Sequence, residues 1–360
     1  MKIPVAEPDL GKKELSFLLS AFKSGWISSK GDFINKFETS FAKYCGTKYA
    51  SSCNNGTSAL HLALLAFGIK EGDEVILPTL TYIATANAIK YVGAKPIFID
   101  SEKGIGSISP KEIEKKITKK TKAIIAVHLY GIPCDMNKIM TIARKNKLYV
   151  IEDCAEAHGA EYSKKKVGSI GDIGCFSFFG NKIITTGEGG MCTSNKKWIK
   201  DKIDLFKNQG NSKTKFYFHD VIGYNYRMTN LQAAIGLAQL KRINYFIRKR
   251  KSNQKIYSTL LNLKKGISFL NERKNSRTVY WMHSILIKNK RDKLMKELKK
   301  KGIETRPFFS LITKMSPYYS KEKFPNAEEL STLGLNLPSS VKLKEIEIRK
   351  ICSFIKRGIK

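Results

Sequence analysis

The chain has 360 residues, 42% hydrophobic and 27% charged, as is typical of a globular protein with one large domain or two ordinary ones. This composition excludes a disordered, collagen-like or coiled-coil protein, and no apolar run reaches the length of a membrane-spanning helix. Lys and Arg number 65 against 31 Asp and Glu, which gives a net charge of +34.

The positive charge leaves nucleic-acid binding open, because clustered Lys and Arg release counterions from phosphates. However, the lysine runs lie apart in polar stretches without interleaved aromatic residues, and no nucleic-acid-binding motif is present. We therefore expect no nucleic-acid partner, although a basic surface attracts small anionic substrates. Seven scattered cysteines without a Cys-x-x-Cys pair, and a start without an apolar signal core, predict free thiols and a cytoplasmic location.

In chain order, an amphipathic stretch at residues 12–22 comes first, and short apolar runs then alternate with helical patterns. Strands separated by helices of this length predict βαβ units and an α/β fold with a mostly parallel sheet. Ligands of such sheets lie at the carboxyl ends of the strands, so the chemistry is expected there. The predicted strands are 74–77, 96–100, 123–128, 148–153, 175–179 and 190–194, and the predicted helices are 57–67, 82–91, 110–116 and 137–145.

The pattern changes in the last third of the chain. A long helical pattern at 230–258 is followed by a strand-like run at 279–287 and a charged helix at 291–301. We therefore predict a large domain over residues 1–249, including the N-terminal segment, and a smaller α+β domain over residues 250–360.

Lys182 is the first candidate catalytic residue. The apolar strand predicted at 175–179 leads to this lysine, and a turn rich in Thr and Gly follows it. An amine flanked by apolar residues can be desolvated and lose its proton, as a Schiff-base nucleophile requires. A surface lysine beside an ordinary turn is the alternative, because the chain is rich in lysine.

A second group of polar residues follows the strand predicted at 148–153. Asp153, Glu156 and His158 lie there, and acids with a histidine at one strand end form a candidate site. A polar loop with a helix cap is the alternative. A metal site is poorly supported, because one His without a second group of ligands is a weak metal signature. We therefore expect no metal.

Two further segments point to a flat, phosphorylated ligand. Gly56 and Thr57 open an apolar helix, whose first N–H groups suit a phosphate, unless Thr57 and Ser58 merely cap the helix. Tyr82 follows the strand at 74–77, where its ring could lie against a flat cofactor or in the core. A phosphate cradle, an aromatic ring, a carboxylate and a lysine together are what pyridoxal 5'-phosphate (PLP) requires.

These segments also carry a resemblance to a known family. Asn-Gly-Thr, Thr-Tyr-Ile-Ala-Thr, Glu-Asp-Cys-Ala-Glu and Phe-Ser-Phe-Phe-Gly-Asn-Lys-Ile-Ile-Thr-Thr-Gly-Glu-Gly-Gly, in this order, resemble the nucleotide-sugar aminotransferases of the DegT/DnrJ/EryC1/StrS family. The resemblance implies the fold of type I PLP-dependent aminotransferases. Trp26-Ile-Ser-Ser-Lys-Gly, the segment from His219 to Asn230 and Glu304-Thr-Arg-Pro are most similar to the branch of the family that forms GDP-perosamine.

The resemblance implies a role for each candidate residue. Lys182 is then the Schiff-base lysine, Asp153 the partner of the pyridine nitrogen, and Tyr82 the aromatic residue that stacks on the ring. Glu156 is implied to lie near the ring hydroxyl, where many relatives carry Gln and the perosamine-forming branch carries Glu.

The resemblance also implies a homodimer with shared active sites. The backbone of Gly56 and Thr57 and the hydroxyl of Ser177 are implied to bind the phosphate. Asn225 is implied to reach the phosphate of the partner subunit's cofactor.

The implied reaction moves an amino group from L-glutamate to the 4-keto group of a nucleotide-linked 6-deoxy sugar, which is expected to be GDP-4-keto-6-deoxy-D-mannose. A dTDP-, UDP- or other keto sugar is the main alternative, and a nucleic-acid-binding or regulatory protein that keeps the fold is another. Related dehydratases carry His in place of the lysine, so Lys182 favours transamination. Arg306 and Lys30 are candidates to meet the diphosphate.

Overall fold

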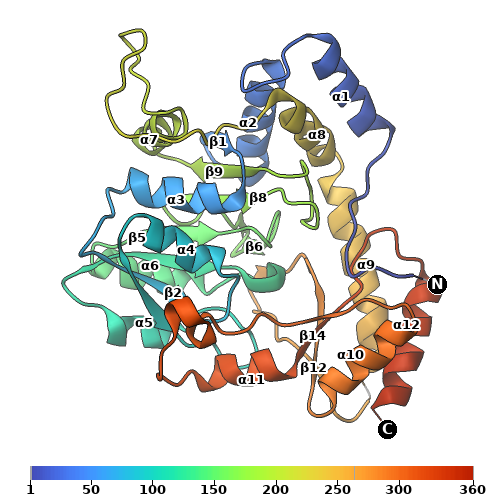
Figure 1. Ribbon diagram of the computed structural model, residues 1–360. Helices are drawn as coiled ribbons and strands as arrows, with labels where there is room; N and C mark the ends of the chain where they lie inside the picture. The colour runs from blue at the N-terminus through green and yellow to red at the C-terminus, as the bar shows by residue number, and fades with distance from the viewer. Residues whose placement is uncertain (1, 263, 360) are drawn as a thin grey trace.

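A central sheet organises the computed structural model, which describes residues 2–262 and 264–359. Its strands are β1 (Tyr49–Cys53), β2 (Glu74–Pro78), β3 (Lys95–Ile99), β4 (Thr121–Val127), β5 (Tyr149–Asp153), β8 (Ile173–Ser177) and β9 (Gly190–Ser194). Their order across the sheet is β1-β9-β8-β5-β4-β2-β3 (Figure 1). Within the described residues, β9 is the only strand of this sheet that runs antiparallel to the other six, which confirms the mostly parallel arrangement. The predicted elements did not include β1.

Helices cover both faces of the sheet because its strands are apolar on both sides. Val75 and Leu77 of β2 contribute to one core and Ile76 to the opposite one, since successive side chains of a strand alternate. One face is covered by α3 (Gly56–Ala66), α4 (Ala84–Tyr91) and α7 (Lys197–Lys207), and the other by α5 (Pro110–Lys116) and α6 (Met136–Lys145).

The amphipathic stretch near the N-terminus is a helix that packs beside the sheet. It forms α1 (Lys12–Lys23), which contacts α8 (Asn230–Leu240), and α8 in turn packs on α2 (Asp32–Cys45). Figure 1 shows these three helices together at one end of the molecule.

The prediction of a single helix over residues 230–258 is wrong, because the helical structure is interrupted between α8 and α9 (Ile243–Leu261). At the break, the Arg242 guanidinium pairs with Asp9 and Glu14 of the N-terminal segment. Both helices bury apolar side chains, so the apolar pattern continues across a turn that is fixed by contacts distant in sequence.

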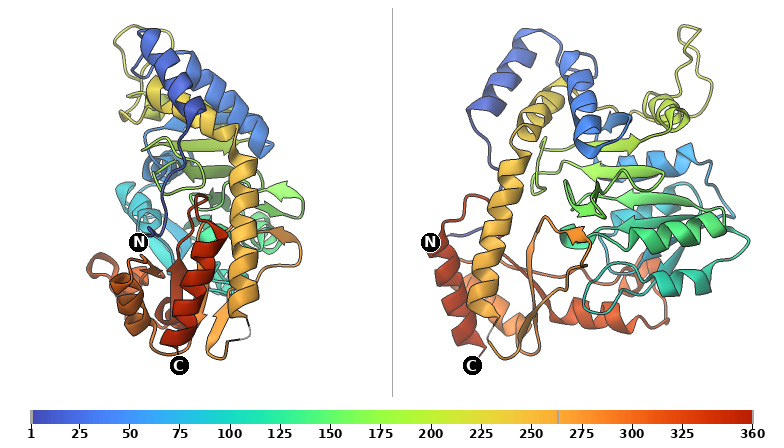
Figure 2. Two further views of the ribbon diagram at one scale, coloured as in Figure 1. Left: turned by 90° about the vertical axis from the view of Figure 1, so that its right-hand side faces the viewer. Right: turned by 180° about the vertical axis from the view of Figure 1, so that it is seen from behind.

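The C-terminal region forms a second, antiparallel sheet. The helix predicted at 291–301 is confirmed, and α9 runs from the α8 end of the molecule into this region (Figure 2). The predicted boundary between residues 249 and 250 therefore falls inside a continuous helix, and the division into two domains stays a prediction. The elements are β10 (Ile267–Phe269), β12 (His283–Ile287), β13 (Arg306–Pro307), β14 (Gly334–Leu337), α10 (Arg291–Lys300), α11 (Pro325–Leu333) and α12 (Glu345–Gly358).

The strand predicted at 279–287 begins only at His283. Tyr280 has a φ of 51°, outside the extended range, and the indole N–H of Trp281 donates to the Asn181 carbonyl at 2.8 Å. Val279 and Trp281 are buried, so their apolar character reflects burial rather than a strand.

Short elements complete the described chain, in which no helix has the length and apolar character needed to cross a bilayer. They are β6 (Glu161–Tyr162), β7 (Lys165–Lys166), β11 (Ser276–Arg277), η1 (Leu129–Gly131), η2 (Ile312–Lys314) and η3 (Ser316–Tyr318).

Candidate active site

A cavity of about 480 Å³ opens where β2, β4, β5 and β8 end and α3 begins. This is the carboxyl edge of the parallel strands, where such sheets bind their ligands. Residues from the C-terminal region close one side of it, including Trp281 and Arg306. The sequence-predicted residues that line the cavity are Gly56, Thr57, Tyr82, Asp153, Glu156, Ser177 and Lys182.

The start of α3 forms one end of the cavity. The Asn55 carboxamide caps this helix by accepting the N–H of Ser58 at 2.8 Å. The N–H groups of Gly56 and Thr57 belong to the first turn, where backbone N–H groups have no acceptor within the helix. A Cβ on Gly56 would lie 2.7 Å from the Ser177 Cβ, so glycine permits this close approach to β8. The N–H groups, the helix dipole and the Ser177 hydroxyl therefore suit a phosphate.

Asp153 ends β5 on the buried floor of the cavity, where it is 6% exposed. Its carboxylate accepts the Thr85 hydroxyl at 2.9 Å and the Ala155 N–H at 3.2 Å. Burial raises the pKa of Asp153, while these hydrogen bonds and the positive charge of Lys182 oppose the rise. The arrangement fixes a carboxylate that can hold a proton on a neighbouring basic nitrogen.

Lys182 interacts electrostatically with the carboxyl groups of Glu156 and Asp153. Burial lowers the pKa of Lys182 and raises that of Glu156 to about 7, and the attraction between amine and carboxyl opposes both shifts. Glu156 is held in place because its Oε2 accepts the N–H of Tyr130 at 2.7 Å. Desolvation therefore favours the neutral amine that a nucleophile or proton carrier needs.

The rim of the cavity is more open than its floor. Tyr82 is 59% exposed, and its ring centroid lies 5.9 Å from that of Phe309. Arg306 is also exposed, and its guanidinium lies 3.3 Å from the carboxylate of Glu304. The rim thus combines aromatic surface with a cation that can meet an anionic ligand.

Comparison with known proteins identifies the family. The DegT/DnrJ/EryC1/StrS aminotransferase family matches residues 8–356. The chain belongs to this family. It is 51% identical over 359 residues to the GDP-perosamine synthase of Escherichia coli O157:H7, covering 98% of this chain and 97% of that protein. It is 45% identical to the GDP-perosamine synthase of Caulobacter vibrioides, covering 97% and 96%.

This chain is also similar to solved structures of sugar aminotransferases. The putative sugar aminotransferase Spr1654 from Streptococcus pneumoniae has a TM-score of 0.95 to this chain in both its PLP-form and its apo-form. The identities are 25% and 26%, and the match covers all of this chain and 99% or 98% of the other. The α/β fold expected for an aminotransferase is thereby confirmed.

Not every residue singled out in the sequence of this aminotransferase lines the cavity. Asn225 is exposed outside it, and its carboxamide oxygen accepts hydrogen bonds from Arg227 at 2.9 and 3.2 Å. Lys30 also lies outside the lining, whereas Arg306 belongs to it. His158 is buried beneath the site, where burial lowers its pKa to about 3 and keeps the ring neutral.

Several lining residues were missed in the sequence because they come from distant segments. Tyr130, from η1, adopts a φ of 52° and donates its N–H to Glu156, and its hydroxyl accepts the N–H of Phe309. Trp281 lies in the segment that the apolar pattern assigned to a strand. The residue types near Tyr130 and Trp281 gave no local sign that these side chains line the site. The only hints in the sequence are the glycine after Tyr130 and the tyrosine before Trp281.

One group of potential metal ligands lies close to this site. Suitable atoms of His128, Glu152 and Cys154 are within 4.8 Å of one another, and all three residues are buried. Glu152 accepts the N–H groups of Ile170 and Gly171 at 2.8 and 2.7 Å, and it lies 3.1 Å from the His128 ring nitrogen. Two members of the group, Glu152 and His128, are therefore engaged in hydrogen bonds within the protein.

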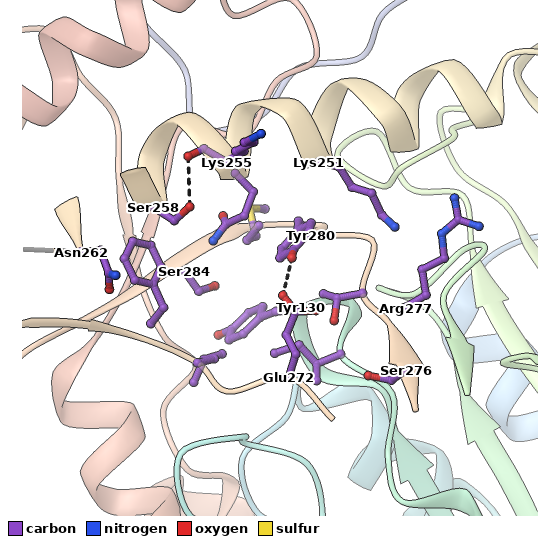
Figure 3. A pocket seen from close by; sticks show the side chains of 16 residues that line it. Tyr130, Lys251, Lys255, Ser258, Asn262, Glu272, Ser276, Arg277, Tyr280 and Ser284 are labelled. Atoms are coloured by element: carbon purple, nitrogen blue, oxygen red, sulfur yellow. Dashed lines mark hydrogen bonds between the residues drawn. The ribbon is translucent and has the colours of Figure 1, made fainter. Parts of the chain in front are cut away.

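A second cavity, of about 530 Å³, lies beside the first and shares Tyr130 and Met282 with it. Figure 3 shows Lys251 on α9 and the hydroxyl of Tyr280 bound to Glu272. The segment that carries Trp281 into the active site is therefore held by contacts on its other side.

Proposed function

We propose that this protein is a PLP-dependent aminotransferase that converts GDP-4-keto-6-deoxy-D-mannose to GDP-perosamine, with L-glutamate as the amino donor. The observation that carries the proposal is the enclosure of Lys182, Asp153 and Glu156 in one cavity at the start of α3. The names of the two relatives, which cover nearly the whole chain, support the sugar substrate.

The residues present fit PLP. Gly56 leaves room for the helix start to meet a phosphate, and Ser177 offers a hydroxyl beside it. Asp153, oriented by Thr85, is a suitable partner for a protonated pyridine nitrogen. Lys182 supplies the amine that binds the aldehyde of the cofactor. When bound, PLP supplies the electron sink that stabilises a carbanion at the reacting carbon.

Each side chain then has a defined task. The Nζ of Lys182 accepts the proton from the donor's Cα and later returns a proton during transfer to the sugar. Asp153 would hold the pyridine nitrogen protonated by offering its negative charge to it. With PLP bound, Tyr82 would offer its ring to the cofactor from the rim, and Glu156, held by the backbone N–H of Tyr130, would offer its carboxyl group to the ring hydroxyl.

The substrate is tested by a set of 4-keto nucleotide sugars with ¹⁵N-glutamate as donor. We expect ¹⁵N to appear in the GDP sugar with the highest kcat/KM. Much faster turnover of a UDP or dTDP keto sugar would contradict the GDP assignment and keep the aminotransferase. No ¹⁵N transfer to any keto sugar would contradict the function itself.

We also propose a homodimer in which each site uses Asn225 of the partner subunit. The segment between α7 and α8 extends away from the fold (Figure 1), and Phe216, Tyr217 and Ile222 on it are 98%, 99% and 87% exposed. Exposed apolar groups of this size mark an interaction surface. Asn225 lies in the same segment, three residues after Ile222, and outside the cavity of its own chain.

Mixing two inactive variants tests the shared site. If Lys182→Ala and Asn225→Ala are carried by separate chains, one site of a mixed dimer inherits both defects and the other inherits neither. Refolding the two together is expected to restore about a quarter of wild-type activity when subunits assort at random. No recovery from two individually inactive variants, or a monomer in sedimentation, would contradict the proposal.

A further inference from the structure

Trp281 contacts Lys182 although the two residues are almost a hundred positions apart. The Nζ of Lys182 lies 4.0 Å from the centroid of the Trp281 ring, in the arrangement of a cation–π contact. The indole N–H donates to the carbonyl oxygen of Asn181, the residue before the lysine, at 2.8 Å. One side chain therefore contacts both the amine and the backbone of the lysine loop.

The Trp281 side chain is itself held firmly. The backbone carbonyl of Trp281 accepts a hydrogen bond from the guanidinium of the buried Arg250 at 2.7 Å, and the same guanidinium donates to the Ser339 carbonyl at 2.9 Å. The ring of Tyr130 stacks against the indole at 6.1 Å between centroids, with an interplanar angle of 19°. Trp281 is only 4% exposed, so the position of its ring is determined from several sides.

A lysine that carries protons alternates between a charged and a neutral amine. Burial disfavours the charged form, and an indole face favours it, more strongly where water is excluded. The Trp281 ring also offers a fixed surface to the Lys182 side chain, which would otherwise move among several rotamers. Its contact is therefore useful at the stage when Lys182 is free and charged.

We propose that Trp281 is a positioning residue that keeps the free Lys182 amine directed into the cavity, through its ring face and its bond to Asn181. This role rests on the proposed aminotransferase function. A tryptophan that merely fills the core would contribute to stability in the same way, but its loss would leave the pKa of Lys182 unchanged or raise it by admitting water.

The test uses Trp281→Leu and Trp281→Phe in the full-length protein stripped of PLP. The accessibility of the neutral amine is followed by pulse acetylation of Lys182 across pH, with mass spectrometry of the peptide that contains it. Because the ring stabilises the ammonium, Trp281→Leu is expected to lower the midpoint pH by about one unit. Phe keeps a weaker ring face, so a downward shift of about half that size is expected.

Trp198→Leu is the matched control, because Trp198 packs on Phe67 and Tyr149 at the surface, away from the lining of the cavity. Its Lys182 midpoint is expected to equal that of the wild type. A midpoint that is unchanged or raised in both folded Trp281 variants would overturn the proposal. If the Leu variant does not fold, the Phe variant decides by the same criterion. The readout does not require turnover, so it can fail independently of the proposed function.

Discussion

The floor and the rim of the cavity differ in burial and in origin. On the floor, Asp153, Glu156 and Ser177 are 5–7% exposed and come from one short stretch of the chain around β5 and β8. On the rim, Tyr82 and Phe179 are 59% and 47% exposed, and Arg306 comes from the C-terminal sheet. The buried floor is thus built from one short stretch of the chain, whereas the rim gathers exposed side chains from distant segments and is open to a ligand.

Burial also gives the floor its electrostatic character. It raises the pKa values of Asp153 and Glu156 and lowers that of Lys182, so all three groups are shifted toward their neutral forms. A charged group at the rim, such as the Arg306 guanidinium, stays hydrated and attracts a ligand of opposite charge electrostatically. We therefore expect floor substitutions to affect the rate of chemistry and rim substitutions to affect substrate binding.

The largest effect is expected for Lys182→Ala. Loss of the amine that moves the proton should reduce kcat by at least about 1,000-fold and leave thermal unfolding nearly unchanged. Steady-state turnover and circular dichroism measure the two properties. Lys111→Ala, which changes an exposed residue of α5, is the control and should keep wild-type activity. Normal multiple turnover by the Lys182 variant would remove this residue from the mechanism.

Asp153→Asn should reduce the rate of the glutamate half-reaction by about 100-fold, because an amide cannot keep the pyridine nitrogen protonated. Cofactor binding should weaken much less, since the phosphate end of the site is intact. Stopped-flow absorbance and a PLP titration separate the two effects. An unchanged rate of the glutamate half-reaction would show that Asp153 is a polar loop residue without a role in the reaction.

Arg306→Ala tests the rim. We propose that this exposed cation of the cavity lining meets the nucleotide sugar, so its removal should raise KM for that substrate about tenfold and leave the glutamate half-reaction unaltered. Arg306→Lys should recover part of the loss. If the half-reaction slowed as much as sugar binding weakened, the distinction between floor and rim would be wrong for this residue.

Glu156→Gln should produce the smallest effect, in the pH dependence of stability. The pKa of Glu156 is raised to about 7 in the folded protein, so the unfolded chain loses this proton at lower pH. Wild-type stability should therefore fall relative to the variant as pH rises from about 4.5 to about 7. Melting curves of the PLP-free proteins at pH 5 and pH 8 should show a change of a few degrees in their Tm difference. A constant difference would show that Glu156 does not titrate there.

The residues on the floor of the cavity could be predicted from the sequence, because they follow strands that are recognisable as short apolar runs. Asp153 and Lys182 each lie directly at or after such a run, and parallel strands bring their ends to one edge. The wall made by Trp281 and Tyr130 was not predictable, because it depends on a break in extended structure and on a φ of 52° that only tertiary contacts select. The same reason explains the turn at Arg242, which is fixed by Asp9 and Glu14.

The central claim, that Lys182 on the floor is the residue that binds the cofactor, has one direct measurement. The purified protein is incubated with PLP, reduced with borohydride, digested, and its peptides are sequenced by mass spectrometry. The account predicts that the pyridoxyl group is on Lys182 and on no other lysine at stoichiometric level. Stoichiometric modification of a different lysine, or none in a folded protein, would contradict it.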